Sequence, residues 1–155
     1  MGANVYYDVL REATVPVQKI LNPHVYVAIN CASHPAGSTG PWSLGLPDVF
    51  SINAIYVNNG TFSNTVSNSL GSFAFDNGQR DNYYGLAQIS AIGNSLNANS
   101  RILVDLNAFT YNQSQGVGFF NANSYPIDDV NTSNAYAIQT QLIPQYYSTL
   151  SLIHI

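Results

Sequence analysis

Hydrophobic and polar residues alternate along several stretches of this chain. The clearest alternation covers residues 101–109, similar runs cover 24–31 and 49–57, and a weaker one covers 83–92. A period of two is typical of a β-strand with one buried face, so these runs predict the main strands. The inward face is predicted for the strand at 101–109, where it consists of Ile102, Val104, Leu106 and Ala108. In the other two strands, one shared face is predicted for Val25, Val27 and Ile29, and one for Phe50, Ile52, Ala54 and Tyr56. Arg101, Asp105 and Asn107 are expected to point outward.

Turn-forming residues separate these runs. Asn22-Pro23 predicts a turn after the first residues of the chain. Residues 33–47 hold three prolines and three glycines, which predicts a long irregular loop. Trp42, the only tryptophan, is expected to pin this loop by covering the core. The alternative is an exposed ring that stacks on a sugar.

The number and spacing of the strand signals indicate the fold class. Further short strands are expected at 73–75 and 117–120, and the chain has no sustained helical period. We therefore predict an all-β fold, an immunoglobulin-like β-sandwich of about seven or eight short strands with long polar loops. A β-barrel is the runner-up.

Composition narrows the range of partners. Of the 155 residues, 46% are hydrophobic and 12% aromatic, but only 8% are charged, against about 25% in ordinary soluble proteins. With four Lys and Arg and a net charge of −4, the chain offers no basic patch. We therefore expect neither nucleic acid nor an anionic membrane as a partner.

The most charged and most specific stretch covers residues 76–84. It consists of Asp76, Asn77, Gly78, Gln79, Arg80, Asp81, Asn82, Tyr83 and Tyr84. Asn77-Gly78 is a turn signal, because both residues tolerate positive φ. An apolar run enters this stretch and an alternating run leaves it, so we interpret it as a polar corner between two strands.

The charged, amide and aromatic side chains of this corner are expected to stabilise it. Arg80 is expected to bind Asp76 on one side and Asp81 on the other. Asn77 and Asn82 are expected to cap backbone groups locally. Tyr83 and Tyr84 should point to opposite faces, so that one anchors in the core. A contact with a neighbouring subunit or domain is the alternative role for the corner.

No pattern of residues indicates catalysis, a cofactor or a metal. The histidines His24, His34 and His154 are dispersed, and the single cysteine, Cys31, is expected to be a buried hydrophobe. No spacing selects a pair of carboxylates for glycoside hydrolysis. The pair at 128–129 is expected to lie in a solvated loop, with a calcium ligand as the alternative.

The segment FDNGQRDNYY at 75–84 resembles a motif of large virion structural proteins of tailed bacteriophages, including tail-fibre and baseplate-associated chains. GPWSLG at 40–45, PDVF at 47–50, RILVDLNAF at 101–109 and FFNANSYPIDD at 119–129 are also similar to these proteins. The resemblance covers roughly residues 14–130. Residues 93–100 depart from it, because relatives often carry a shorter turn there.

The resemblance implies a non-catalytic structural module that mediates assembly contacts in the virion tail. Its implied partners are other virion proteins, with a homo-oligomer expected, and the chain would be made in the host cytoplasm. The alternative is a β-sandwich module that binds carbohydrate or another host-surface group, with Trp42 and Tyr125 as the contact surface. A depolymerase fragment is a third and more distant reading.

The sequence also predicts segment boundaries. Residues 1–22 are expected to be a strand or linker from a preceding segment, 23–130 the β-sandwich domain and 131–149 the start of a following segment. The last six residues, LSLIHI at 150–155, resemble translated sequencing-adapter sequence at the end of a metagenomic fragment. The natural protein is then expected to continue beyond Thr149.

Overall fold

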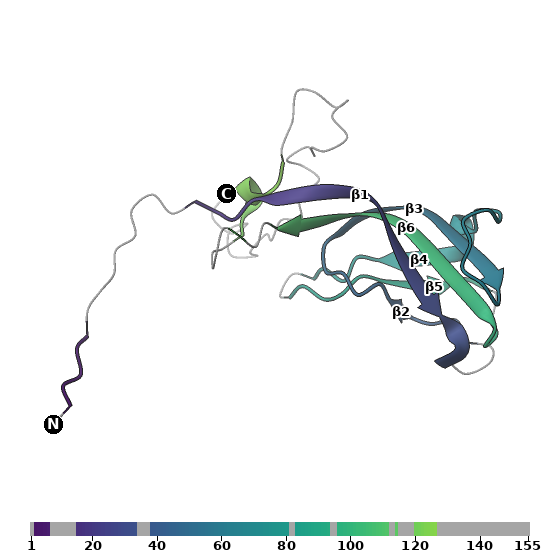
Figure 1. Ribbon diagram of the computed structural model, residues 1–155, viewed down its shortest axis with the longest axis horizontal. Coiled ribbons are helices and arrows are strands. Elements are labelled where there is room, and N and C mark those ends of the chain that lie inside the picture. The colour runs from purple at the N-terminus through teal and green to yellow at the C-terminus, as the bar shows by residue number, and fades with distance from the viewer. Residues whose placement is uncertain are drawn as a thin grey trace, which may run out of the picture.

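The computed structural model of this protein describes residues 2–6, 15–33, 38–80, 83–93, 96–111, 114 and 120–126, which form two antiparallel sheets. The first sheet has the order β1-β6-β3 and the second the order β2-β5-β4 (Figure 1). The strands are β1 (Lys19–Asn30), β2 (Trp42–Ser43), β3 (Val49–Asn59), β4 (Phe73–Asp76), β5 (Gln88–Ala91) and β6 (Ser100–Tyr111). Three 3₁₀ turns, η1 (Cys31–Ser33), η2 (Leu70–Ser72) and η4 (Ala122–Ser124), are the helical elements of the described residues.

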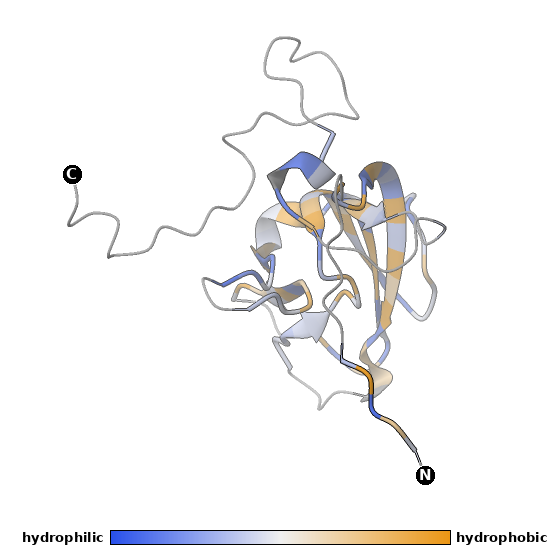
Figure 2. Ribbon diagram, turned by 90° about the vertical axis from the view of Figure 1, so that its left-hand side faces the viewer, coloured by the Kyte–Doolittle hydropathy of each residue, from blue (hydrophilic) through white to orange (hydrophobic). Residues whose placement is uncertain are grey.

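The all-β prediction is therefore confirmed. The described residues form six strands, and their two sheets share one hydrophobic core. Ile55 and Ile102 of the first sheet and Trp42 and Ile89 of the second all belong to this core. Figure 2 shows hydrophobic and hydrophilic positions interleaved along the long strands. The expected strand at 117–120 and the segments beyond residue 126 lie largely or wholly outside the described residues.

The central strand β6 behaves as its alternation predicts. Ile102, Val104, Leu106 and Ala108 are each at most 1% exposed, so the expected inward face is confirmed. The strand β1 pairs with it in antiparallel register, with Val27 opposite Val104. Its residues Val25, Val27 and Ile29 share one face, as expected, and this face contacts the core: Ile29 is buried, and Val25 and Val27 pack against the cluster.

Two β-bulges change which side chains of β3 point toward the core. The register with β6 shifts between Val49 and Ser51 and again between Ile52 and Ala54. Each bulge places an extra residue in one strand and reverses the side-chain alternation after it. Val49, Ile52, Ile55 and Val57 therefore contact the core, whereas Phe50 is 38% exposed. The prediction that Phe50, Ile52, Ala54 and Tyr56 lie on one side of the strand was wrong for this reason.

A bulge also replaces the turn expected at Asn22-Pro23. The register of β1 shifts between Asn22 and Val25, and His24 has φ 54°. The strand continues on both sides of this irregularity from Lys19 to Asn30. Pro23 fits because β1 lies at the edge of its sheet, where a missing backbone N–H is tolerated.

The loop before β3 lies along β5 and is fixed there by Trp42. Leu44 N–H donates to the Ala87 carbonyl at 2.8 Å, and Ala87 N–H donates to the Leu46 carbonyl at 2.8 Å. The Trp42 ring is only 2% exposed and lies 6.5 Å from the Phe73 ring. The expected pin is confirmed, and the alternative of a sugar-stacking Trp42 was wrong, because the ring has no exposed face.

Candidate functional site

The polar corner joins β4 to β5 as a narrow hairpin loop. Gly85 N–H donates to the Gly78 carbonyl at 2.7 Å, and Arg80 N–H donates to the Tyr83 carbonyl at 2.9 Å. Gly78 has φ 73°, and a Cβ added there would lie 2.5 Å from the Leu86 carbonyl oxygen. Only glycine satisfies both the backbone conformation and this close approach, so the Asn77-Gly78 signal marks the right place.

Asp76 holds the base of this corner. Its two carboxylate oxygens accept from Arg80 Nη1 at 3.0 Å and from Nη2 at 2.7 Å, a bidentate pair. Gly78 N–H at 2.9 Å and Gln88 Nε2 at 3.3 Å donate to the same carboxylate. The hydrogen bonds from Arg80, and then that from Gly78, hold the pKa of Asp76 well below its usual range.

The other predicted roles in the corner have mixed outcomes. Asn77 Oδ1 accepts from Gln79 N–H at 3.0 Å, which is the local capping expected of it. Asp81 and Asn82 lie outside the described residues. Tyr83 and Tyr84 are 57% and 72% exposed, so the prediction that one of them anchors in the core was wrong. The buried positions that follow the corner belong to Ala87 and Ile89, both 0% exposed.

A cluster that the sequence did not indicate lies against the corner. Asp48 Oδ2 accepts from Lys19 Nζ and, at 3.0 Å, from the Tyr125 hydroxyl, while Lys19 Nζ also donates to that hydroxyl at 2.9 Å. Gln79 Nε2 lies 3.4 Å from Asp48 Oδ1 and connects the corner to this cluster. Burial, and then the negative charge of Asp48, raises the pKa of Tyr125 above its usual range. Lys19 is 29 positions from Asp48 and 106 positions from Tyr125, so the spacing of these residues in the sequence does not reveal that they meet.

Aromatic rings surround this cluster. The Phe109 ring lies 4.9 Å from Tyr125 and 5.7 Å from Phe50, in edge-on packing. Lys19 Nζ lies 4.8 Å above the Phe120 ring, a cation–π contact, and Phe120 is 47% exposed. Tyr125, expected on the contact surface, is partly buried, and both its hydroxyl and its ring are occupied by these contacts.

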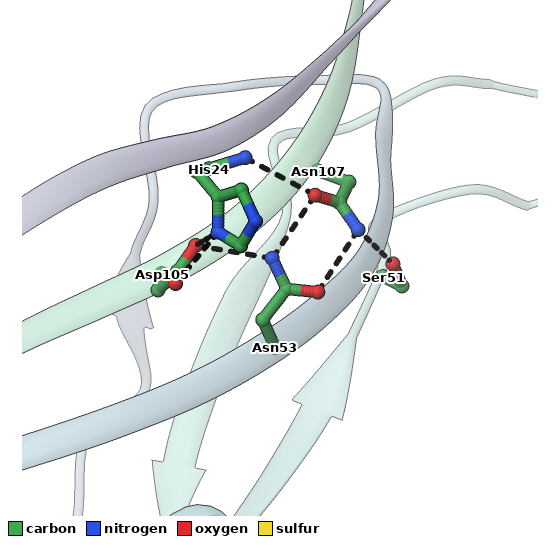
Figure 3. A network of polar contacts seen from close by, with 5 residues as sticks. All are labelled: His24, Ser51, Asn53, Asp105 and Asn107. Atoms are coloured by element: carbon green, nitrogen blue, oxygen red, sulfur yellow. Dashed lines mark hydrogen bonds and ion pairs between the residues drawn. The ribbon is translucent and has the colours of Figure 1, made fainter. Parts of the chain in front are cut away.

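A second polar network crosses the outer face of the first sheet, and Figure 3 shows its five residues. His24 Nδ1 lies 3.0 Å from Asp105 Oδ2, and Asn53 Nδ2 donates to Asp105 Oδ1 at 3.0 Å. Asn53 and Asn107 exchange side-chain hydrogen bonds of 3.0 and 2.9 Å, and Asn107 Nδ2 donates to Ser51 Oγ at 2.9 Å.

This network covers Asp105, which points outward as expected. Asp105 does lie on the face away from the core, but it is only 6% exposed. His24, placed by the bulge in β1, and Asn53, placed by the bulge in β3, both bond to it. A carboxylate buried in this way needs such partners to offset the loss of hydration. Its main role is therefore to join three strands.

The arrangement of these groups offers little chemistry. In the described part of the chain, no hydroxyl or thiol bonds to the His24 ring. Ser51, the one hydroxyl drawn in Figure 3, bonds to Asn107. Cys31 is buried, and this burial raises the pKa of its thiol. Among the described residues, no three His, Cys, Asp or Glu gather closely enough to hold a metal ion.

Comparisons with known proteins add no family to this description. No protein-family model, curated protein or solved structure matches the chain. Among the described residues, no helix is long and apolar enough to cross a membrane.

Proposed function

We propose that this chain is a non-catalytic structural module of a tailed-phage virion, in the tail fibre or baseplate. The proposal includes an immunoglobulin-like β-sandwich as its architecture, with the two described sheets as its layers. The resemblance of the corner at 75–84 to virion proteins motivates it. Its role would be to present rigid surface to neighbouring virion proteins.

One observation supports assembly above the other roles: the corner holds exposed aromatic side chains on a backbone that is itself tightly bonded. Tyr83, Tyr84 and Leu86 are each more than half exposed. The loop that carries them is closed by the Asp76–Arg80 pair and by the close contact of Gly78 with Leu86. Tyrosine offers a large contact area and loses little side-chain entropy on binding, which suits a protein contact.

The test combines detection in virions with a contact variant. The chain should be found by mass spectrometry among the proteins of purified particles, at a fixed copy number. A Tyr83→Ser/Tyr84→Ser variant should fold as before, since both side chains are exposed, but should enter particles poorly. Phe62→Ser, an exposed aromatic in the loop between β3 and β4, is the matched control and should assemble normally. Absence of the chain from particles would refute the proposal.

A second candidate is the binding of a host-surface glycan. The exposed rings of Tyr111 and Phe120, 5.5 Å apart beside the Lys19–Asp48 pair, favour it, because sugars stack on aromatic faces next to polar groups. Buried Trp42 is not part of this version. Calorimetry with purified host polysaccharide should give measurable heat that Phe120→Ala abolishes, while Phe62→Ala leaves it unchanged. Equal heats from all three proteins would contradict it.

A further inference from the structure

Within the described part of the chain, the outer edge of β1 has no partner over five residues. β1 pairs with β6 on one side only, and an antiparallel pair leaves alternate backbone N–H and C=O groups pointing away from its partner. No backbone group of residues 25–29 bonds to any described group outside β6. Such a row of unpaired groups is a template for another strand.

The other edges of the two described sheets are bonded in part, bulged or short. On β3, Ser69 N–H donates to the Ile55 carbonyl at 2.7 Å, and Asn68 Oδ1 accepts from Ile55 N–H at 3.1 Å. In the second sheet, β2 has two residues and β4 has four. The outer edge of β3 is bonded at Ile55 and interrupted by two bulges between Val49 and Ala54. Residues 25–29 of β1 are therefore the longest regular stretch of edge without a partner among the described residues.

The open segment has defined ends. On its N-terminal side, Pro23 lacks an N–H and His24 lies in the bulge with positive φ. On its C-terminal side, the chain turns into η1 at Cys31. Between these ends, residues 25–29 (VYVAI) contain no proline, glycine or charge, so nothing in them opposes pairing.

We infer that this edge pairs with the same edge of a second copy of the chain. In an antiparallel pair with Val27 on the two-fold axis, Tyr26 lies opposite Ala28 of the other copy, and Val25 lies opposite Ile29. Tyr26 then meets the smaller Ala28 on the outer face, whereas on the core-side face Ile29 meets Val25 and Val27 meets its own copy. The pairing ends where Pro23 meets Cys31 of the other copy, so the limits of the segment are matched as well.

The result is a continuous six-stranded sheet with β1 and its copy at the centre. Tyr26 is 49% exposed in the single chain and would be covered across the pair. No charged side chains face each other across the pair, because residues 25–29 carry no charge. This dimer extends the assembly role proposed above, but it depends only on the fold and forms in solution without other virion proteins.

The register gives the sharpest test. Proteins carrying Tyr26→Cys and Ala28→Cys, both in a Cys31→Ala background, are mixed and oxidised. Directly opposed residues lie within disulfide range, so the mixture should give a cross-linked dimer. Two copies of Tyr26→Cys should not cross-link, because diagonal neighbours are about 7–8 Å apart. Cross-linking of Tyr26→Cys with itself, or none in the mixture, would overturn the proposed pairing.

A second measurement protects the test from a folding failure. In sedimentation equilibrium, the average molar mass of the native chain should approach that of a dimer at high concentration and fall toward that of a monomer on dilution. Tyr26→Lys/Ala28→Lys places lysines opposite each other and should raise the dimer Kd by at least about tenfold. The control Phe62→Lys/Asn64→Lys adds the same charge on an exposed loop and should leave the dimer intact. A native chain that is monomeric at every concentration would refute the dimer, whereas absence from virions would refute only the proposed function.

Discussion

At the scale of single residues, the corner depends on two positions with different physical demands. Gly78 is required by backbone geometry, since its φ is 73° and its Cα faces the Leu86 carbonyl. Asp76 is required for its negative charge, since its carboxylate accepts a hydrogen bond from each terminal nitrogen of Arg80. The turn chemistry of Asn77-Gly78 was readable from sequence because it is local. The exposure of Tyr83 and Tyr84 was not, because it depends on which later residues fill the core.

We expect Gly78→Ala to destabilise the fold by about 2 kcal/mol or more. The added methyl group combines left-handed backbone strain with a clash against backbone atoms that cannot move aside easily. Gly45→Ala is the control: φ is 72° there, but a Cβ meets nothing within 4 Å, so only the strain of about 1 kcal/mol applies. Urea unfolding measures both. Equal losses would show that the Leu86 contact does not matter.

The Asp76–Arg80 pair should make stability depend on pH in the acid range. The folded-state pKa of Asp76 is lowered below that of the unfolded chain, which is about 3.9. Its contribution is therefore present above about pH 4 and is lost as the pH falls and the folded carboxylate takes up a proton. Asp76→Asn should have a lower urea midpoint than the native chain at pH 7, and the gap should narrow toward pH 2. A constant gap would contradict this assignment.

At the scale of elements, bulges decide how the first sheet presents its residues. The bulge in β1 and the two in β3 lie at the two edges of the same sheet. They bring His24 and Asn53 over Asp105 of the central strand. Alternation predicted the strands themselves, but it could not locate the bulges, because one inserted residue costs little locally and is stabilised by contacts with another strand.

His24 should tolerate glycine better than alanine. Both substitutions remove the contact with Asp105. Alanine, like histidine, is strained at the positive φ of this position, whereas glycine is not. We expect His24→Ala to be less stable than His24→Gly by roughly 1 kcal/mol in urea unfolding. At Ala28, an exposed position in the regular part of β1, the replacement by glycine should instead destabilise. Equal stability of the two His24 variants would argue against the left-handed bulge.

At the scale of the whole molecule, one core joins the two sheets. Ile102 in the first sheet and Trp42 in the second belong to the same buried cluster. The cluster of Lys19, Asp48 and Tyr125 makes a further connection, between β1, the residues before β3 and the segment that follows η4. A molecule tied together in this way should unfold as one unit.

Ile102→Ala tests whether the two sheets unfold together. Removing a side chain that is 0% exposed should cost about 2–5 kcal/mol. Fluorescence of Trp42, the only tryptophan, reports on the second sheet, yet its unfolding midpoint should shift together with the far-UV circular dichroism of the whole chain. Ile92→Ala, at a position 57% exposed, should change stability by less than about 0.5 kcal/mol. A Trp42 transition that does not move would mean that the sheets unfold separately.

The sequence by itself determined the all-β class, the inner face of β6, the buried role of Trp42 and the glycine turn of the corner. These features follow from local rules, namely alternation, side-chain size and backbone freedom. Only the tertiary structure decided the facing of β3, the burial of Asp105, the Lys19–Asp48–Tyr125 cluster and the open edge of β1. Each of these depends on which distant strand lies alongside, and pairing between distant strands leaves no mark in the spacing of one chain.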